Sequence, residues 1–121
     1  MTRNDSVDGL VGLYLDVLRV ERGLAENSIA AYGRDLARLA SFCERESVSS
    51  VGEIDRRFLE RFVLSLDEEG LSSRSIARTV SALRGFTRFL VHDGWRQEDP
   101  AARIGAPKFG RRLPNVLSRE E

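Results

Sequence analysis

The chain has 121 residues, of which 41% are hydrophobic and 31% charged, and this composition is typical of one folded domain and not of a disordered segment. One cysteine and one histidine exclude an internal disulfide and the multi-cysteine zinc patterns, so we expect no metal site and no cofactor. The sequence has no apolar run of membrane-spanning length and no signal-peptide stretch at its start, so we expect a cytoplasmic protein without a membrane partner.

The formal net charge is zero, but the charges are segregated along the chain. Residues 1–69 carry nine arginines against fourteen acidic residues, whereas residues 70–112 carry nine basic residues against three acidic ones. A basic half produces a local field that favours a polyanion even when the whole chain is neutral. The charge pattern therefore keeps nucleic acid open as a partner.

Apolar residues recur at three- and four-residue steps along nearly the whole chain, which predicts an all-α fold. The first helix is expected at about 6–22, where Gly23 ends it as a left-handed cap, and the second at about 26–46. Their predicted core stripes are Val7, Leu10, Val11, Tyr14 and Leu18 in the first, and Ile29, Tyr32, Leu36, Leu39, Ala40 and Cys43 in the second.

The second half of the chain predicts two more long helices. Asp55 is expected to cap the third, which Gly70 stops, and Ser72 or Ser73 to cap the fourth, which runs to about His92. The predicted core stripe of the third helix is Ile54, Phe58, Phe62, Val63 and Leu66.

The last part of the chain changes character. The pair Asp99-Pro100 is typical of a helix start, which predicts a short fifth helix. Glycine, proline and basic residues follow and predict an extended linker, and Ser118 with Glu121 is typical of a capping box at the start of another helix. We therefore expect a compact four-helix bundle with a short fifth helix, a basic interdomain linker, and the start of an absent domain: residues 1–104, 105–117 and 118–121.

The predicted fourth helix has two unlike faces. At about 100° per residue its apolar residues fall on one side, and the opposite side carries arginine, serine and glycine without an acidic residue. Such a face suits close approach to a phosphate backbone, its arginines can reach base edges in a major groove, and the helix N-terminus adds backbone donors. The candidate DNA-binding residues here are Ser72, Ser73, Arg74, Ser75, Arg78, Ser81, Arg84 and Arg88.

The predicted second helix and the linker extend this basic surface. Opposite its core stripe the second helix again mixes basic and small residues, although Asp35 interrupts the pattern. The further candidates are Asn27, Ser28, Ala31, Arg34 and Arg38 in the helix, and Lys108, Arg111 and Arg112 in the linker. Two alternatives stay open, namely that the arginines serve solubility alone, or that they bind an acidic protein partner.

The residues whose side chains could act in catalysis are expected to have structural roles instead. Tyr14 and Tyr32 lie on apolar stripes and are expected in the core, not as nucleophiles. Cys43 is expected to be a buried thiol, His92 a helix C-terminal residue, and Trp95 a packing residue, with base stacking as its minor alternative. We therefore assign no catalytic residue to this chain.

Three stretches carry a resemblance to the tyrosine site-specific recombinases. LAENSIAAYGRDLARLASF (24–42) and GLSSRSIARTVSALRGFTRFL (70–90) resemble the second and fourth helices of their N-terminal core-binding domain. DPAARIGAPKFGRRLPNVLSREE (99–121) is similar to their interdomain connector, which ends in Leu-Pro-x-x-Leu-Ser. The likeness is greatest to the Xer branch, which resolves chromosome dimers, with phage-type integrases as neighbours.

The resemblance implies a four- or five-helix, SAM-like bundle whose second and fourth helices contact the major groove of a double-stranded recombination site. It also implies that an absent C-terminal domain carries the catalytic tyrosine, which forms a covalent 3′-phosphotyrosyl link, so the present chain is not itself an enzyme. Four protomers of such proteins assemble on two DNA sites, and we expect the isolated chain to be a monomer. Gly33 and Gly85 depart from the larger or polar residues common in the family.

Overall fold

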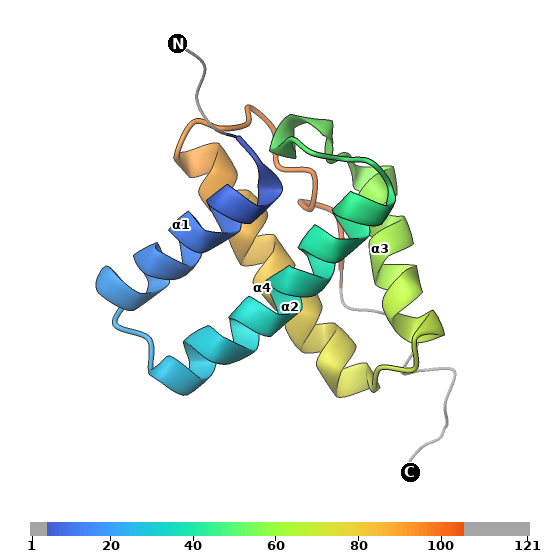
Figure 1. The fold of residues 1–121 in the computed structure, drawn as a ribbon, viewed down its shortest axis with the longest axis horizontal. Helices are drawn as coiled ribbons and strands as arrows, with labels where there is room; N and C mark the ends of the chain where they lie inside the picture. Colours follow the sequence, from blue (N-terminus) through green and yellow to red (C-terminus); the bar gives the residue numbers. More distant parts are fainter. Residues whose placement is uncertain (1–4, 106–121) are drawn as a thin grey trace.

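A computed structural model of the chain describes residues 5–105, and these residues form an all-α bundle (Figure 1). Within this range the only β-type pairing is one isolated bridge between Ser6 and Ser50, so the expected fold class is confirmed. The elements, in chain order, are α1 (Val7–Val20), α2 (Glu26–Arg45), the 3-10 helix η1 (Val51–Glu53), α3 (Arg56–Glu68) and α4 (Ser73–His92).

Polar side chains start three of the four helices. The side-chain oxygens of Ser6, Asp55 and Ser72 accept hydrogen bonds from backbone N–H groups three residues on, at 3.1, 2.8 and 3.1 Å. Each bond satisfies a donor that has no partner inside its helix, which typically stabilises the helix by about 1 kcal/mol. The predicted caps of α3 and α4 are thereby confirmed, with Ser72 and not Ser73 as the cap of α4. The fourth helix, α2, begins after Ala25, which makes no side-chain cap bond.

Two glycines end helices as the sequence predicts. Gly23 and Gly70 follow α1 and α3 with φ angles of 63° and 89°, in the left-handed region that residues with a Cβ adopt rarely. The chain therefore turns sharply after both helices and leads directly into α2 and α4.

The two longest helices, α2 and α4, cross at the centre of the bundle, with α1 packed against both and α3 packed against α4 (Figure 1). Aromatic pairs join the outer helices to this centre. Phe42 of α2 lies 5.1 and 5.5 Å from the rings of Phe58 and Phe62 of α3. Burial of each large apolar side chain contributes about 1.5–3 kcal/mol, so the apolar stripes of the four helices stabilise one shared core.

The segment after α4 differs from its prediction. Residues 100–103 form a hydrogen-bonded turn where the sequence predicted a short fifth helix. Asp99 does cap it, because its side chain accepts from the N–H of Ala101 at 2.9 Å, but the backbone bonds there span only three residues. So short a segment cannot repay the cost of nucleating an α-helix, and the buried side chains of Ala101 and Ile104 hold it as a turn. The predicted start of a further domain and most of the predicted linker lie outside the described residues.

Candidate nucleic-acid interface

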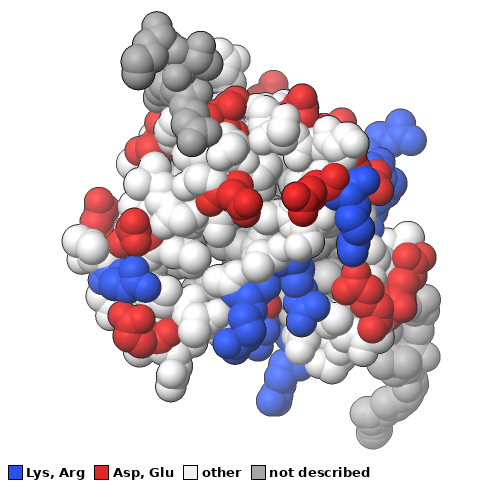
Figure 2. Space-filling view, in the orientation of Figure 1, with Lys and Arg blue, Asp and Glu red and all other residues white. Residues whose placement is uncertain are grey.

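Basic side chains gather on one face of the bundle. Figure 2 shows arginine side chains clustered between α2 and the N-terminal half of α4, while acidic side chains lie above α2 in the same view. Because α2 and α4 cross, residues from two distant parts of the chain share this surface. The structure thus brings the two predicted basic helix faces together.

Four of the predicted contact residues are arginines with no opposing charge nearby. Within residues 5–105, no acidic side chain lies within 4.0 Å of the guanidinium of Arg34, Arg74, Arg84 or Arg88. Three of these side chains are exposed and Arg84 is half-buried. Their donors are therefore available to an anion without first breaking an ion pair, and each guanidinium can offer two parallel N–H groups to a phosphate.

The arginine one turn after Arg74 on α4 is held differently. Arg78 donates from Nε to Oδ2 of Asp35 at 2.9 Å and from Nη2 to Oδ1 at 2.8 Å, which is a bidentate pair between α4 and α2. The carboxylate of Asp35 is completely buried, whereas 42% of the Arg78 side chain is exposed. The hydrogen bonds and charge of Asp35 raise the pKa of Arg78 above its usual value. Asp35 therefore does not interrupt the basic face, as its position on α2 suggested, but lies beneath it.

A third partner completes this cluster. The hydroxyl oxygen of Thr79 lies 3.1 Å from Oδ1 of Asp35 and 2.8 Å from the carbonyl oxygen of Ser75. Thr79 is buried on α4, so the carboxylate of Asp35 is bound by two successive residues of that helix. Both oxygens of this buried carboxylate accept from the charged guanidinium, and Oδ1 has the threonine hydroxyl beside it as well, so the carboxylate is electrostatically satisfied.

A basic groove runs along α2 next to the end of α3. Its volume is about 410 Å³, and Glu69 lies in it at 4.0 Å from Nη1 of Arg38 and 3.6 Å from Nη2 of Arg45. The carboxylate comes from the end of α3, so α2 by itself gives no sign of it. The lining residues are Arg34, Ala37, Arg38, Ser41, Arg45 and Glu69.

The serines at the start of α4 mostly serve the helix itself. Ser72 is the cap, and its hydroxyl also lies 3.1 Å from the hydroxyl of Ser75. Ser73 is half-buried and Ser81 is exposed on the outer face. On α2, Asn27 and Ser28 are exposed and Ala31 is half-buried, whereas Lys108, Arg111 and Arg112 lie outside the described residues.

The two tyrosines support the structural interpretation of the sequence. Tyr14 is buried, and this burial raises the pKa of its hydroxyl. Tyr32 is partly buried against the same core. A nucleophilic tyrosine needs an accessible hydroxyl among activating groups, and Tyr14 does not offer one.

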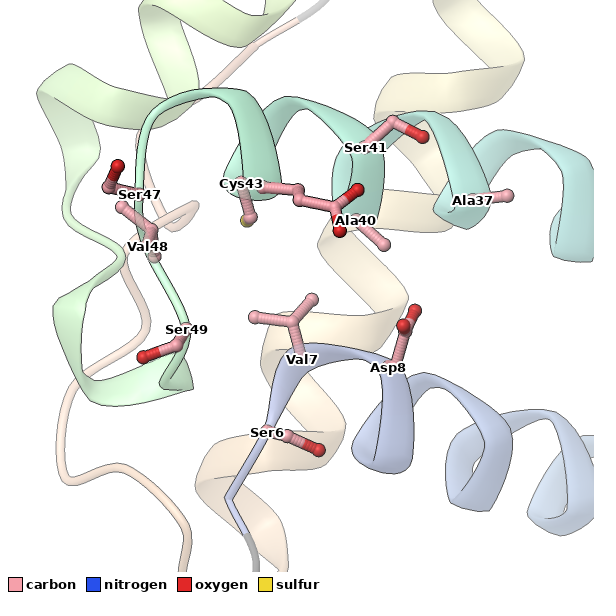
Figure 3. A pocket seen from close by; sticks show the side chains of 11 residues that line it. Ser6, Val7, Asp8, Ala37, Ala40, Ser41, Cys43, Ser47, Val48 and Ser49 are labelled. Carbon is pink, nitrogen blue, oxygen red and sulfur yellow. The ribbon is translucent and has the colours of Figure 1, made fainter.

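A second groove, between α1 and α2, is acidic where the first is basic. It measures about 490 Å³, and Figure 3 shows Val7 and Asp8 of α1 facing Ala40 and Cys43 of α2 across it. Two acidic residues and no basic residue line it, so it does not suit a phosphate backbone. Burial, with the nearby charges of Asp8 and Glu53, raises the pKa of the Cys43 thiol to about 12, and the predicted buried thiol is confirmed.

Among residues 5–105 there is no group of three or more histidine, cysteine, aspartate or glutamate side chains that could hold a metal ion. In that part of the chain no helix combines the length and apolar character that crossing a bilayer requires.

The bundle and its arginine face define a small all-α domain with a basic surface across two crossed helices. The chain belongs to the family of phage integrase N-terminal SAM-like domains, whose family model matches residues 11–94. The resemblance to the core-binding domain of this family, stated from the sequence motifs, is thereby confirmed.

Curated relatives are Xer-type tyrosine recombinases. The chain is 44% identical over 104 residues to the tyrosine recombinase XerC of Azotobacter vinelandii, which covers 86% of this chain and 35% of that protein. It is 42% identical over 108 residues to XerD of Caulobacter vibrioides, with 89% and 35% covered, and 34% identical over 115 residues to XerD of Staphylococcus haemolyticus, with 95% and 39% covered. The chain thus spans little more than a third of the length of these relatives and corresponds to their N-terminal core-binding domain. No solved structure matches it.

Proposed function

We propose that this domain binds one face of a double-stranded DNA recombination site through α2 and α4, as the core-binding part of a site-specific recombinase. The observation that carries the proposal is the set of exposed arginines on two crossed helices that have no acidic partner among residues 5–105. A major groove admits one helix, and phosphates on both sides of it can be neutralised by the arginines around that helix.

Within this proposal the contact residues divide by position. Residues on the outer face of α4 and the start of α2 reach base edges: Arg74, Arg78, Ser81, Asn27, Ser28, Ala31 and Arg34. Residues farther along the helices, at the start of α4 and in the linker bind the phosphate backbone: Arg38, Arg84, Arg88, Ser72, Ser73, Ser75, Lys108, Arg111 and Arg112. Base contacts determine sequence preference, and backbone contacts determine affinity and orientation.

The same proposal extends to the protein of which such a domain is a part. Its relatives are named tyrosine recombinases, and we propose that DNA cleavage uses a tyrosine of a separate catalytic domain, through a covalent 3′-phosphotyrosyl intermediate. Residues 105–117 then serve as the interdomain linker, and residues 118–121 open that catalytic domain. Further protomers on the paired DNA sites, chromosome dimer resolution and a cytoplasmic location belong to the same proposal.

Fluorescence anisotropy across a salt series tests the DNA-binding proposal. One labelled duplex carries the candidate dimer-resolution site of the source genome, and the other is a scrambled sequence of the same composition. We expect tighter binding to the site and a log–log salt slope of about −4 or steeper, because several phosphates are neutralised. Absence of binding to both duplexes at low salt would reject the proposal and favour an acidic protein as the partner of the arginine face.

A further inference from the structure

We propose that Asp35 is a positioning residue for DNA recognition, which holds the guanidinium of Arg78 in one orientation so that its remaining edge meets the duplex. This inference rests on the proposed function of α4 as a DNA-contacting helix. Asp35 cannot touch DNA itself, because its carboxylate is completely buried. Its effect on base preference therefore passes through Arg78.

Asp35 binds one edge of the Arg78 guanidinium and leaves the other edge without a hydrogen bond among residues 5–105. Asp35 occupies Nε and Nη2, and within residues 5–105 Nη1 makes no hydrogen bond. Because 42% of the side chain is exposed, Arg78 still lies at the surface of α4 while it is paired with Asp35. The carboxylate is buried and its Oδ1 also lies 3.1 Å from the hydroxyl oxygen of Thr79, so the aspartate has little room to follow the guanidinium if it turns. The two hydrogen bonds to Asp35 therefore fix the plane of the Arg78 guanidinium.

A fixed guanidinium differs in function from a free one. Arg74 lies one turn earlier on the same face and has no ion-pair partner among the described residues, so its long side chain keeps its rotamer freedom. A free arginine can follow a phosphate in many positions, but immobilising it on binding opposes affinity. A held arginine loses little further freedom and discriminates more sharply between arrangements of acceptors. The structure thus assigns the sharper sequence discrimination to Arg78 and a more adaptable DNA contact to Arg74.

Stability alone does not account for the pair. A buried ion pair contributes about as much to folding as well-packed apolar residues of similar volume, so a bundle that needed only stability has simpler solutions. What an apolar pair cannot do is present an oriented cation at a surface. The half-exposed arginine above a fully buried carboxylate is the feature that a role in recognition explains.

A role in positioning Arg78 and a purely structural role predict different results for Asp35→Asn. This variant removes a negative charge beneath the DNA-facing surface, so binding to a scrambled duplex should tighten by roughly twofold or more. It also frees the guanidinium, so preference for the selected sequence over the scrambled one should fall by roughly tenfold. A purely structural residue would move both affinities in the same direction and leave their ratio unchanged.

The experiment uses the 121-residue chain and a library of random duplexes, from which bound sequences are selected and read. Folding of each variant is checked first by circular dichroism and thermal unfolding. Thr87→Val is the matched control, because Thr87 is a buried threonine of α4 whose hydroxyl, within residues 5–105, bonds only to the carbonyl oxygen of Arg84. Asp35→Asn should lose preference at one or two adjacent base pairs, and Thr87→Val should keep the full preference.

A double variant tests whether Asp35 acts through Arg78. In an Arg78→Ala background, Asp35→Asn should change the base preference no further. If Asp35→Asn does not fold, Arg78→Lys decides, because lysine keeps the charge but cannot bind both carboxylate oxygens in a fixed plane. Lost preference with an unchanged salt slope then supports the proposal, and unchanged preference overturns it.

The outcomes also separate this inference from the proposed function. If the unaltered chain selects a sequence and the folded variants select the same one, Asp35 is only a structural residue and the DNA-binding proposal stands. If the unaltered chain selects no sequence and binds no duplex, both proposals fall together.

Discussion

The backbone of Gly85 on α4 lies directly against the hydroxyl group of Tyr14 on α1, and a Cβ built at this glycine would overlap the hydroxyl oxygen. The buried tyrosine ring packs against Phe86 and Phe89, with ring centroids at 5.8 and 5.3 Å, so it has little room to move aside. Glycine at this position therefore allows the close approach of α1 to α4. Gly85 is half-buried against α1 and is not an open position on the surface of α4.

Gly85→Ala should destabilise the bundle, although alanine is the better helix former. Relief of the overlap requires a shift of the buried tyrosine, and overpacking of this kind typically costs about 1–3 kcal/mol. The gain in helix propensity, about 1 kcal/mol, offsets only part of it. Urea unfolding followed by circular dichroism measures the difference.

Tyr14→Phe provides the control for this prediction. Without the hydroxyl, the nearest ring carbon lies 3.4 Å from the added Cβ, which is close to ordinary van der Waals contact. In this background Gly85→Ala should raise the free energy of unfolding. Gly12→Ala on α1 should do the same in the unaltered chain, because no atom of another helix lies within 4 Å of a Cβ built there. Equal stabilisation by both alanines in the unaltered chain would contradict the steric explanation.

Glu69→Gln should strengthen DNA binding. The substitution removes the carboxylate that lies beside Arg38 and Arg45 in the basic groove and competes there with phosphate. We expect severalfold tighter binding to any duplex, with a change in folding stability below about 1 kcal/mol because all three side chains are exposed. Anisotropy at fixed salt measures the affinity. Glu68→Gln changes the charge equally, and Glu68 makes no ion pair within residues 5–105, so a comparable gain there would show that only net charge matters.

Arg34→Ala and Arg74→Ala should each weaken binding to duplex DNA. Loss of one phosphate contact lowers the salt slope by about one, and loss of a base contact costs about 1–3 kcal/mol with relaxed preference at one position. Arg57→Ala on α3 is the matched control, since Arg57 is also exposed and has no ion-pair partner in the described part of the chain. Titrations of the three variants at several salt concentrations compare them. An equal loss for Arg57→Ala would place the interface elsewhere.

The Cys43 thiol should be unreactive in the folded chain and should make stability fall at high pH. Its pKa is raised from 9.0 to about 12, so above pH 9 the unfolded chain releases a proton that the folded chain keeps. The free energy of unfolding is thus unaffected by this group below pH 9 and decreases between pH 9 and 12. Urea unfolding from pH 8 to 10.5 measures the slope, and Cys43→Ala should reduce it. Rapid modification of the native thiol by a disulfide reagent at pH 8 would contradict its burial.

By itself the sequence determined the helices, the caps of α3 and α4, and the existence of basic faces on α2 and α4. These features depend on neighbours within one or two turns, such as Asp55 with the N–H of Phe58, or on apolar periodicity along one helix. The resemblance to recombinases also rested on local motifs, and the family match confirms it. The assignment of individual DNA contacts stays a prediction.

Only the tertiary structure decided which charges are free and which are held. Asp35 and Arg78 are 43 residues apart in the chain, and Glu69 reaches Arg38 from a different helix, so no local pattern pairs them. The place of Gly85 against Tyr14 likewise depends on how α1 crosses α4. The turn at 100–103 replaced the predicted helix because its buried side chains, not its cap, set its conformation. A helical pattern states which residues share a face, and packing between helices determines what each face meets.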